Sequence, residues 1–408
     1  MTIHEESGVA GHSKAVQDRA GMPLDGVVVV ELGDSASAPF AGKALAELGA
    51  EVWKVERPSG DSSRGWGPSS WEGSGASFYA LNRGKKLVRI DIKDPQQLER
   101  LQRFITTRAD VFLHNLRPGT SVRYGLDAAS LRAVNPELIH CEVGAFGHAG
   151  PMKTLPGYDP LMQAFAGIMS LMGEEGQPPV RAGVSIVDFG TGMWSTIGIL
   201  AALFGRERSG RGASVDTSLL ESALAWMTVG IANYNTDGDV GGRFGSGVGF
   251  IVPHRAFSAA DGDLVVGCAN DALFAGLAEV LDHPEWATDE RFATNQARLR
   301  NREEIDGAIG AVLATRTRAH WMTVLGARGI PAAPVQTVGE IVAHPQTEAL
   351  EMIGDSSDAR GPRLVGLPIS FDGVRPAPGK QARAVGADDD EFLDKLTGVP
   401  GAAGTRIE

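Results

Sequence analysis

The chain has 408 residues and a formal net charge of −12, so it is too long for one ordinary hydrophobic core and too acidic for general binding to nucleic acid or anionic membranes. Its two cysteines, Cys141 and Cys268, cannot build a disulfide framework, which favours a cytoplasmic protein. Residues 1–22 are polar and predict a flexible leader, and no run approaches the roughly 18 to 20 apolar residues that a membrane span needs.

The first third of the chain begins with the pattern of a βαβ unit. Residues 26–32 (GVVVVEL) predict a buried strand, residues 38–48 a helix, and residues 51–56 (EVWKVE) a second strand. This order predicts a right-handed crossover in a parallel sheet. The turn after the first strand contains one glycine, Gly33, where a dinucleotide-binding turn needs three, which argues against an NAD site.

A basic segment follows. A basic strand is expected within 82–93, a helix over 94–107 and a strand over 110–114. Residues 81–123 contain ten Lys and Arg against four Asp and Glu, an excess of +6. One interpretation is a solvated basic face. The other is a site for a small polyanion such as coenzyme A, because the basic residues recur at the ends of predicted strands, where α/β sheets bind ligands.

In the middle of the chain a carboxylate lies next to a long apolar segment. A short apolar run ends at Asp188, Gly190 and Gly192 follow, and an apolar helix is predicted after them. Aspartate is a favoured N-cap, so Asp188 is open to a purely structural interpretation. Alternatively, partial burial makes it a nucleophile, with the glycine N–H groups facing a developing oxyanion.

Many motifs in register resemble one family. They include LNRGKKLVRIDIKDPQ, ADVFLHNLRPGTSVRYGLD, NPELIHCEVGAFGHAGP, GYDPLMQAFAG, DFGTGMWSTIGILAAL and GIPAAPVQTVGEIVAHPQ. Over residues 24–346 the chain resembles the family III CoA-transferases (the CaiB/BaiF group), which include formyl-CoA transferase, carnitine CoA-transferase and the α-methylacyl-CoA racemases. The resemblance implies an enzyme whose substrates are coenzyme A thioesters.

The resemblance also implies the fold. It is an α/β fold with a large Rossmann-like domain built from both chain ends, a smaller α+β domain, and two subunits interlocked as a homodimer. We therefore assign residues 23–220 and 331–408 to the large CoA-binding domain and 221–330 to the small domain. The local patterns predict a long helix over 216–233 and an α+β unit over 257–330.

By resemblance, Asp188 is the catalytic nucleophile. In the transferases the corresponding aspartate attacks an acyl-CoA to give a mixed anhydride, and the released CoA thiolate then forms an aspartyl-CoA thioester. Tyr158 replaces the histidine that the racemases use as their second base, and tyrosine is a poor proton shuttle at neutral pH. This difference favours a transferase over a racemase-type isomerase. A non-catalytic acyl-CoA-binding protein is the remaining alternative.

The resemblance further implies residues that contact coenzyme A and a glycine loop that closes over the intermediate. Gly245 and Gly247, assigned to catalysis, lie in that loop at 241–249. The expected coenzyme A contacts are Ala36, Ser37, Arg57, Ile90, Lys93, Asn115, Leu116, Arg117, Arg123, Tyr158 and Asp159. The histidines show no metal-binding spacing, so we expect no metal and no permanently bound cofactor. The expected partners are an acyl-CoA, a carboxylic acid acceptor and a second copy of the chain, without nucleic acid or membrane.

Overall fold

The computed structural model describes residues 21–398, so most of the predicted leader lies outside the described residues. The chain forms two compact units. The first contains the described residues up to Gly157, Asp188–Ser222 and the residues from Glu351 onward. The second contains Tyr158–Val187 and Ala223–Leu350. The domain boundaries given above stay a prediction.

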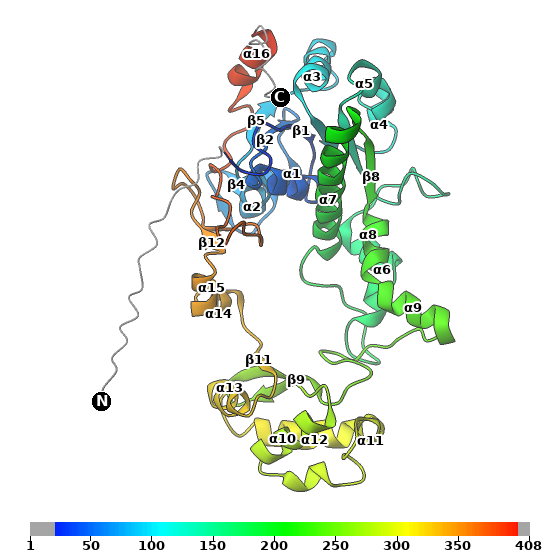
Figure 1. The fold of residues 1–408 in the computed structure, drawn as a ribbon, viewed down its shortest axis with the longest axis vertical. Helices are drawn as coiled ribbons and strands as arrows, with labels where there is room; N and C mark the ends of the chain where they lie inside the picture. The colour runs from blue at the N-terminus through cyan, green and yellow to red at the C-terminus, as the bar shows by residue number, and fades with distance from the viewer. Residues whose placement is uncertain (1–20, 399–408) are drawn as a thin grey trace, which may run out of the picture. The chain divides into compact units, whose positions relative to one another are not determined.

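A six-stranded parallel sheet forms the centre of the first unit (Figure 1). Its order is β5-β2-β1-β6-β7-β8, and β1 is paired on both sides, with Val29 opposite Val52 of β2 and Val111 of β6. The strands are β1 (Val28–Leu32), β2 (Glu51–Glu56), β5 (Lys86–Arg89), β6 (Val111–His114), β7 (Ile139–Gly144) and β8 (Ser214–Ser218). The predicted α/β class and parallel sheet are confirmed.

Apolar residues that alternate along the strands build a core on each face of this sheet. On one face, Val29, Val52 and Val111 pack with α1 (Ser37–Glu47) and α7 (Ile186–Ser209). On the other face, Val30 and Trp53 belong to a core with residues of α3 (Pro95–Arg108), α5 (Ala128–Val134) and α16 (Asp389–Thr397). Short elements of this unit are η1 (Ser62–Gly65), β3 (Ser70–Trp71), β4 (Ser74–Gly75), α2 (Ala76–Asn82), α4 (Thr120–Arg123), β12 (Ile353–Gly354) and β13 (Leu364–Val365).

The second unit has its own core around a three-stranded antiparallel sheet, ordered β11-β10-β9. These strands are β9 (His254–Ala259), β10 (Gly262–Gly267) and β11 (Ala332–Pro334), covered by α10 (Asp271–Val280), α11 (Asn295–Arg300), α12 (Arg302–Leu313) and α13 (Arg318–Ala327). The unit also includes α6 (Asp159–Phe165), η2 (Ile168–Leu171), α9 (Thr228–Asp237), η3 (Pro284–Ala287), α14 (Val338–Val342) and α15 (Pro345–Ala349).

The prediction of one long helix over 216–233 is wrong at its start. Residues 214–218 form β8, the edge strand of the parallel sheet, and the helical part is divided into α8 (Leu219–Trp226) and α9. Val215 and Thr217 pair with Cys141 and Val143 of β7. Tertiary pairing therefore overrides the local helical pattern at the beginning of this stretch.

Within residues 21–398, α7 is the one helix long and apolar enough to cross a membrane by length and composition alone. An apolar helix was predicted in this stretch, and three of its residues, Thr191, Ser195 and Thr196, carry hydroxyl groups. Ile199 is fully buried in the core against the sheet. Ser195 Oγ is 2.8 Å from Thr217 Oγ1, and Thr191 Oγ1 donates to Ser222 Oγ at 2.9 Å. These contacts are typical of a core helix.

Charged residues are buried at the carboxyl end of β1. Glu31 Oε2 lies 2.6 Å from Lys85 Nζ, and Glu31 Oε1 lies 3.0 Å from Lys54 Nζ. Lys54 also pairs with Asp61 at 2.7 Å, and the Lys54, Lys85 and Glu31 side chains have no exposed surface. Gly42 of α1 packs directly against the Glu31 carboxylate. A Cβ added at Gly42 would overlap Glu31 Oε2.

Gly42→Ala should therefore destabilise the protein, because neither the helix nor the buried carboxylate has room for the methyl group. We expect a loss of about 1–3 kcal/mol in the free energy of unfolding, measured by urea denaturation. Gly205→Ala in α7 is the matched control, since a Cβ there meets nothing within 4 Å. The control should be neutral or stabilising. Equal stability of the two variants would contradict the close packing of α1 on Glu31.

Candidate active site

Asp188 lies in the first turn of α7, not before the helix. The helix begins at Ile186 and already contains Asp188, Gly190 and Gly192, whereas the sequence pattern placed its start after the two glycines. Asp188 is therefore not an N-cap, and this part of the sequence interpretation is wrong. Its side chain is half-buried, close to the fully buried Val187. A carboxylate in the first turn is stabilised by the dipole of this 24-residue helix.

Gly190 and Gly192 lie inside α7, so their N–H groups belong to the helical hydrogen-bond ladder. The proposed oxyanion role of these two groups is therefore wrong. At Gly192 a Cβ would lie 2.7 Å from Ser37 O and 2.9 Å from Phe40 Cδ1. The Phe40 and Phe189 rings are also in contact, with centroids 5.0 Å apart. Gly192 thus serves the close packing of α7 on α1.

Asp159 is a buried carboxylate at the start of α6. Its Oδ2 accepts a hydrogen bond from Val187 N at 2.7 Å, and its Oδ1 accepts one from Gln163 Nε2 at 2.6 Å. Gln163 Oε1 in turn accepts from Ala182 N at 2.9 Å. Asp159 therefore fixes the residue that precedes Asp188. Its neighbour Tyr158 is 63% exposed.

Two residues that were predicted to contact coenzyme A, Arg57 and Asn115, lie in one cluster at the carboxyl ends of β1, β2 and β6. Asp34 N donates to Asn115 Oδ1 at 2.9 Å, and Asn115 Nδ2 donates to Asp34 O at 2.7 Å. The Asp34 carboxylate accepts from Ser62 N and Ser62 Oγ, and lies 3.3 Å from Arg57 Nη2. Ser35, in the same turn, has a φ of 70°.

This cluster lies at the topological switch point of the sheet. From β1 the chain builds the sheet outward through β2 and β5, and it then returns to place β6 on the other side of β1. Ligands of open α/β sheets bind outside the strand ends at such a point. Asp34 was missed by the sequence analysis, because an aspartate in a turn is common and only its partner 81 residues away marks it.

The other predicted contacts differ in exposure. Ala36 and Ser37 are buried at the start of α1, and Ile90 is buried after β5. Leu116 is half-buried after β6. The basic members are exposed on loops and at the end of α4: Lys93, Arg117 and Arg123. The structure thus brings Arg57, Asn115 and the turn before Ala36 together, whereas between residues 21 and 398 no hydrogen bond or ion pair joins the side chains of the three exposed basic residues to that cluster.

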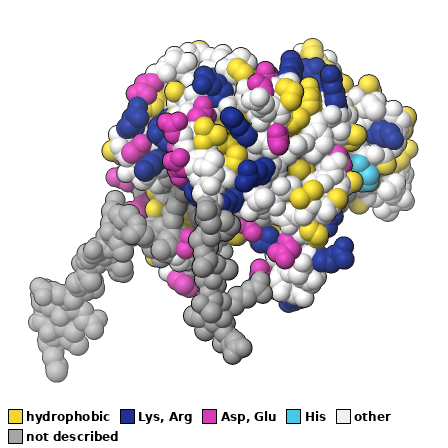
Figure 2. Space-filling view, turned by 90° about the horizontal axis from the view of Figure 1, so that it is seen from above, with side chains coloured by type: hydrophobic (Ala, Val, Ile, Leu, Met, Phe, Trp, Pro, Cys, Tyr) yellow, Lys and Arg dark blue, Asp and Glu magenta, His cyan; other side chains and the backbone are white. Residues whose placement is uncertain are grey.

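The basic segment 81–123 is largely neutralised by acids from elsewhere in the chain. Arg83 pairs with Glu47 at 2.8 Å, and Lys85 pairs with Glu31. Lys86 pairs with Glu51 and Glu391, and Arg89 with Asp389. Figure 2 shows Lys and Arg interspersed with Asp and Glu on the face seen from above. Four of the ten basic residues are therefore used in ion pairs with acids outside the segment.

Two buried histidines hold the end of β6. His114 Nε2 lies 3.3 Å from His140 Nε2 of β7, and Leu116 N is 3.4 Å from His114 Nδ1. Burial and the neighbouring His140 lower the pKa of His114 to about 3. Burial lowers the pKa of His140 as well. Both rings are neutral at pH 7 and order the strand end that leads into Asn115.

The loop 241–249 contacts residues 173 and 174 of the second unit. Gly245 N donates to Gly173 O at 2.9 Å. Gly245 has a φ of 61°, and a Cβ there would overlap the Glu174 carboxylate. At Gly247 a Cβ would lie 3.1 Å from the carbonyl oxygens of His254 and Phe244. Position 245 thus favours glycine through its backbone conformation, Gly247 is closely packed, and the catalytic role of the loop stays a prediction.

No group of three or more His, Cys, Asp or Glu side chains that could hold a metal ion occurs between residues 21 and 398. The expected absence of a metal and of a permanently bound cofactor stays a prediction.

Comparison with known proteins gives consistent matches. The model of CoA-transferase family III matches residues 24–389. Succinyl-CoA:glutarate CoA-transferase of Mus musculus is 36% identical over 79% of this chain and 74% of its own length. Succinyl-CoA–D-citramalate CoA-transferase of Chloroflexus aurantiacus is 36% identical over 90% of this chain and 94% of its own. The crystal structure of a CaiB/BaiF family protein from Brucella suis has a TM-score of 0.85 and 35% identity, covering 92% of this chain and 99% of that one.

The neutral state of His114 predicts an acid-sensitive stability. In the unfolded chain a histidine gains its proton near pH 6.5, whereas folded His114 stays neutral down to about pH 3. Lowering the pH from 7.5 to 5.5 should therefore cost about 1 kcal/mol at this residue. In urea denaturation at both pH values, His114→Gln should lose about that much less stability than the wild type. An equal loss in both proteins would contradict the assignment.

Proposed function

Because the chain belongs to CoA-transferase family III and is therefore a CoA-transferase, we propose that it moves CoA from an acyl-CoA to a carboxylic acid through covalent intermediates on Asp188. The observation that carries the proposal is the position of Asp188, a half-buried carboxylate in the first turn of α7. Partial burial removes water that would otherwise shield the carboxylate, and the helix dipole stabilises a negative charge at this end of α7.

The first half of the proposed reaction releases the donor acid. A carboxylate oxygen of Asp188 attacks the thioester carbonyl, the C–S bond breaks, and the CoA thiolate leaves with the electron pair. The product on the enzyme is a mixed anhydride. The thiolate then attacks the carbonyl carbon of Asp188, the donor acid leaves as a carboxylate, and an aspartyl-CoA thioester remains.

The second half repeats these steps in reverse order. The acceptor carboxylate attacks the aspartyl-CoA thioester, which gives a new mixed anhydride and frees the thiolate. The thiolate attacks the acceptor acyl carbon, forming the new acyl-CoA and restoring the Asp188 carboxylate. None of these steps adds a proton to carbon or removes one from it. The proposed reaction therefore requires no second base at position 158.

We propose that coenzyme A binds at the switch point of the parallel sheet. The supporting observations are the Asp34–Asn115 hydrogen bonds, the nearby Arg57, and the buried Ala36 and Ser37 at the start of α1. Exposed Arg123 and Lys93 are proposed as phosphate and nucleotide contacts. An exposed guanidinium or ammonium group without a salt bridge among the described residues suits a phosphate partner.

We further propose a cytoplasmic homodimer. Both cysteines are free and buried, which suits a reducing compartment. On α7 the side chains of Met193, Trp194, Ile197 and Phe204 are exposed. An apolar helix face of this kind marks an interaction surface, and we assign it to the second subunit.

Asp188→Asn should abolish transfer, because an amide has no nucleophilic carboxylate oxygen. The rate should fall by at least about a thousandfold, while the dissociation constant for CoA, measured by calorimetry, should change little. Glu303→Gln, an exposed residue in the first turn of α12, is the matched control.

Hydroxylamine trapping tests the intermediate itself. The wild type mixed with acyl-CoA and hydroxylamine should give a hydroxamate at Asp188, detected by peptide mass spectrometry. Absence of this adduct, together with exchange of the α-hydrogen of the acyl group with solvent, would support the racemase-type alternative instead.

The proposed subunit contact predicts that Ile197→Glu disrupts the dimer, because it places a charge in the apolar face of α7. Light scattering coupled to gel filtration should give the mass of two chains for the wild type and a lower mass or aggregation for this variant. Val134→Glu, at an exposed position of α5, should stay dimeric. A monomeric wild type would contradict the proposal.

A further inference from the structure

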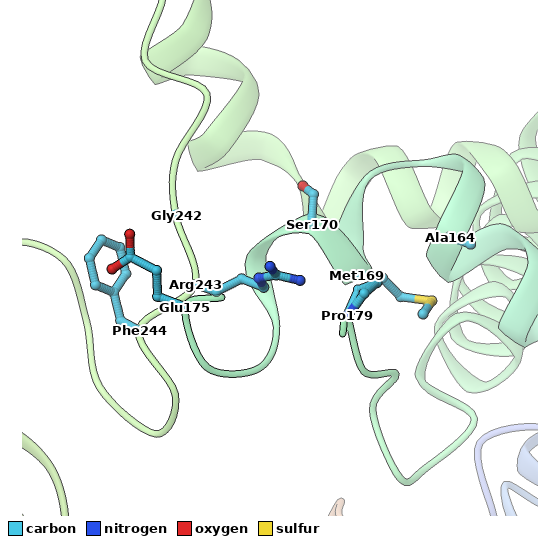
Figure 3. Close-up of a pocket in the computed structure, with 8 residues that line it drawn as sticks. All are labelled: Ala164, Met169, Ser170, Glu175, Pro179, Gly242, Arg243 and Phe244. Carbon is cyan, nitrogen blue, oxygen red and sulfur yellow. The ribbon is translucent and has the colours of Figure 1, made fainter. Parts of the chain in front are cut away.

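A cavity of about 400 Å³, here called the two-arginine cavity, lies in the first unit between α5 and the connection from α7 to β8. Its volume falls within the usual range for small-molecule sites, about 300–1,000 Å³. The lining contains two arginines and no acid: Ala128, Ala129, Arg132, Ala133, Pro136 and Arg211. The larger pocket of about 640 Å³ in the second unit differs, because its lining contains both Arg243 and Glu175 (Figure 3).

The two-arginine cavity lies at the amino ends of two neighbouring parallel strands. Pro136 precedes β7 and Arg211 precedes β8, and Gly212 N donates to Pro136 O at 2.9 Å, which joins the two connections. The cluster of Asp34 and Asn115 lies at the opposite, carboxyl edge of the same sheet. Because β7 has six residues, the two edges are roughly 20 Å apart. The cavity is therefore separate from the place that we propose for coenzyme A.

The Arg132 guanidinium group is fixed at this cavity by its hydrogen bond to a tightly packed glycine. Arg132 Nη2 donates to Gly212 O at 2.7 Å. A Cβ at Gly212 would lie 2.1 Å from Leu138 O, so the backbone that accepts this bond is closely packed. Arg132 Nε is buried and has no hydrogen-bond acceptor within the described part of the chain. Since nearly all buried polar atoms of native proteins have a partner, such a donor favours an acceptor from outside the chain.

Arg211 brings a second guanidinium group to the same cavity. Its side chain forms no hydrogen bond or ion pair with any residue between 21 and 398. The Asp127 carboxylate, at the start of α5, accepts hydrogen bonds from Ser130 N and Ser130 Oγ, and no salt bridge joins it to either arginine in this part of the chain. The cavity thus carries two positive charges that are not paired with an acid, in a chain whose net charge is −12.

The charge of the cavity favours a dianion. Both α5 and α7 end beside it, and each helix end carries about half a negative charge, so about one positive charge remains after the two arginines are counted. A phosphate group has a charge near −2 at pH 7 and three acceptor oxygens, so that it can bind guanidinium groups from two segments at once. One guanidinium group alone matches a carboxylate. The alanine and proline side chains give an organic group next to the phosphate an apolar wall.

From these observations we infer that the two-arginine cavity binds a phosphate monoester, with Arg132 and Arg211 on the phosphate and the alanine side chains against the organic group. Coenzyme A itself carries a phosphate monoester at its 3′ position, but the cavity lies at the other edge of the sheet. The two ligands therefore bind to the chain at the same time. This inference goes beyond the proposed function and does not depend on catalysis.

The test measures the binding of phenyl phosphate to the full chain by calorimetry at pH 7.5, with and without saturating CoA. Phenyl phosphate is a monoester with an apolar group, and phenyl sulfate has nearly the same shape but a single negative charge. The variants are Arg211→Met, Arg211→Lys and Arg132→Lys. Arg300→Met, at an exposed position of α11 in the second unit, is the matched control.

The CoA-saturated wild type should bind phenyl phosphate at one site per chain, and phenyl sulfate at least about fivefold more weakly. Arg211→Met should raise the Kd for phenyl phosphate about five- to tenfold, because it removes one of the two guanidinium groups. Arg211→Lys should recover part of this loss, and Arg300→Met should have no effect. Arg132→Lys should also weaken binding, but Arg132 bonds Gly212 O as well, so Arg211→Met is the decisive variant.

Four results would overturn the inference: no binding of phenyl phosphate to the wild type, an equal Kd for phenyl sulfate, an equal Kd in the wild type and Arg211→Met, or loss of binding in the presence of CoA. The last result would assign the two arginines to a phosphate of CoA. Failure of the proposed function looks different. In that case CoA itself gives no heat of binding or no transfer, while phenyl phosphate still binds and Arg211→Met still weakens it.

Discussion

The first unit depends on the burial of Glu31 between Lys54 and Lys85. Charges without solvent are costly unless they are paired at close range, and here each lysine also bonds a carbonyl of the turn or helix after β1. Lys54 Nζ donates to Gly33 O, and Lys85 Nζ to Pro39 O. Burial lowers the pKa of Lys85 to about 8 against the opposing effect of Glu31. The ion pairs therefore hold strand, turn and helix together at the end of the sheet where we place coenzyme A.

The buried ion pairs of Glu31 also determine the position of Asp188, because α1 packs on Glu31 and α7 packs on α1. Gly42 allows α1 to lie on the Glu31 carboxylate, and Gly192 allows α7 to lie on the first turn of α1. A side chain at either glycine would push one helix away from the next. The chemistry proposed for Asp188 therefore requires two glycines whose function is to let helices approach each other, and Gly192 contributes to the site by packing, with its N–H group in the helical ladder.

The sequence predicted elements well wherever local pattern and packing agree. The strand over residues 51–56 has the predicted bounds, and the helix predicted from Asp94 is capped by that residue. Predictions failed where the deciding partner is distant. β8 is a strand because β7 lies beside it, and part of the +6 charge of residues 81–123 is paired with Glu47, Glu51, Glu391 and Asp389, which lie far away in the sequence. No local pattern marks Asp34 or the His114–His140 contact for the same reason.

Different contacts position the proposed nucleophile and the loop 241–249. Asp188 depends on the packing of α1 and α7, whereas the loop 241–249 is hydrogen-bonded through Gly245 to Gly173. A change in the loop 241–249 should therefore leave the buried ion pairs and the start of α7 undisturbed.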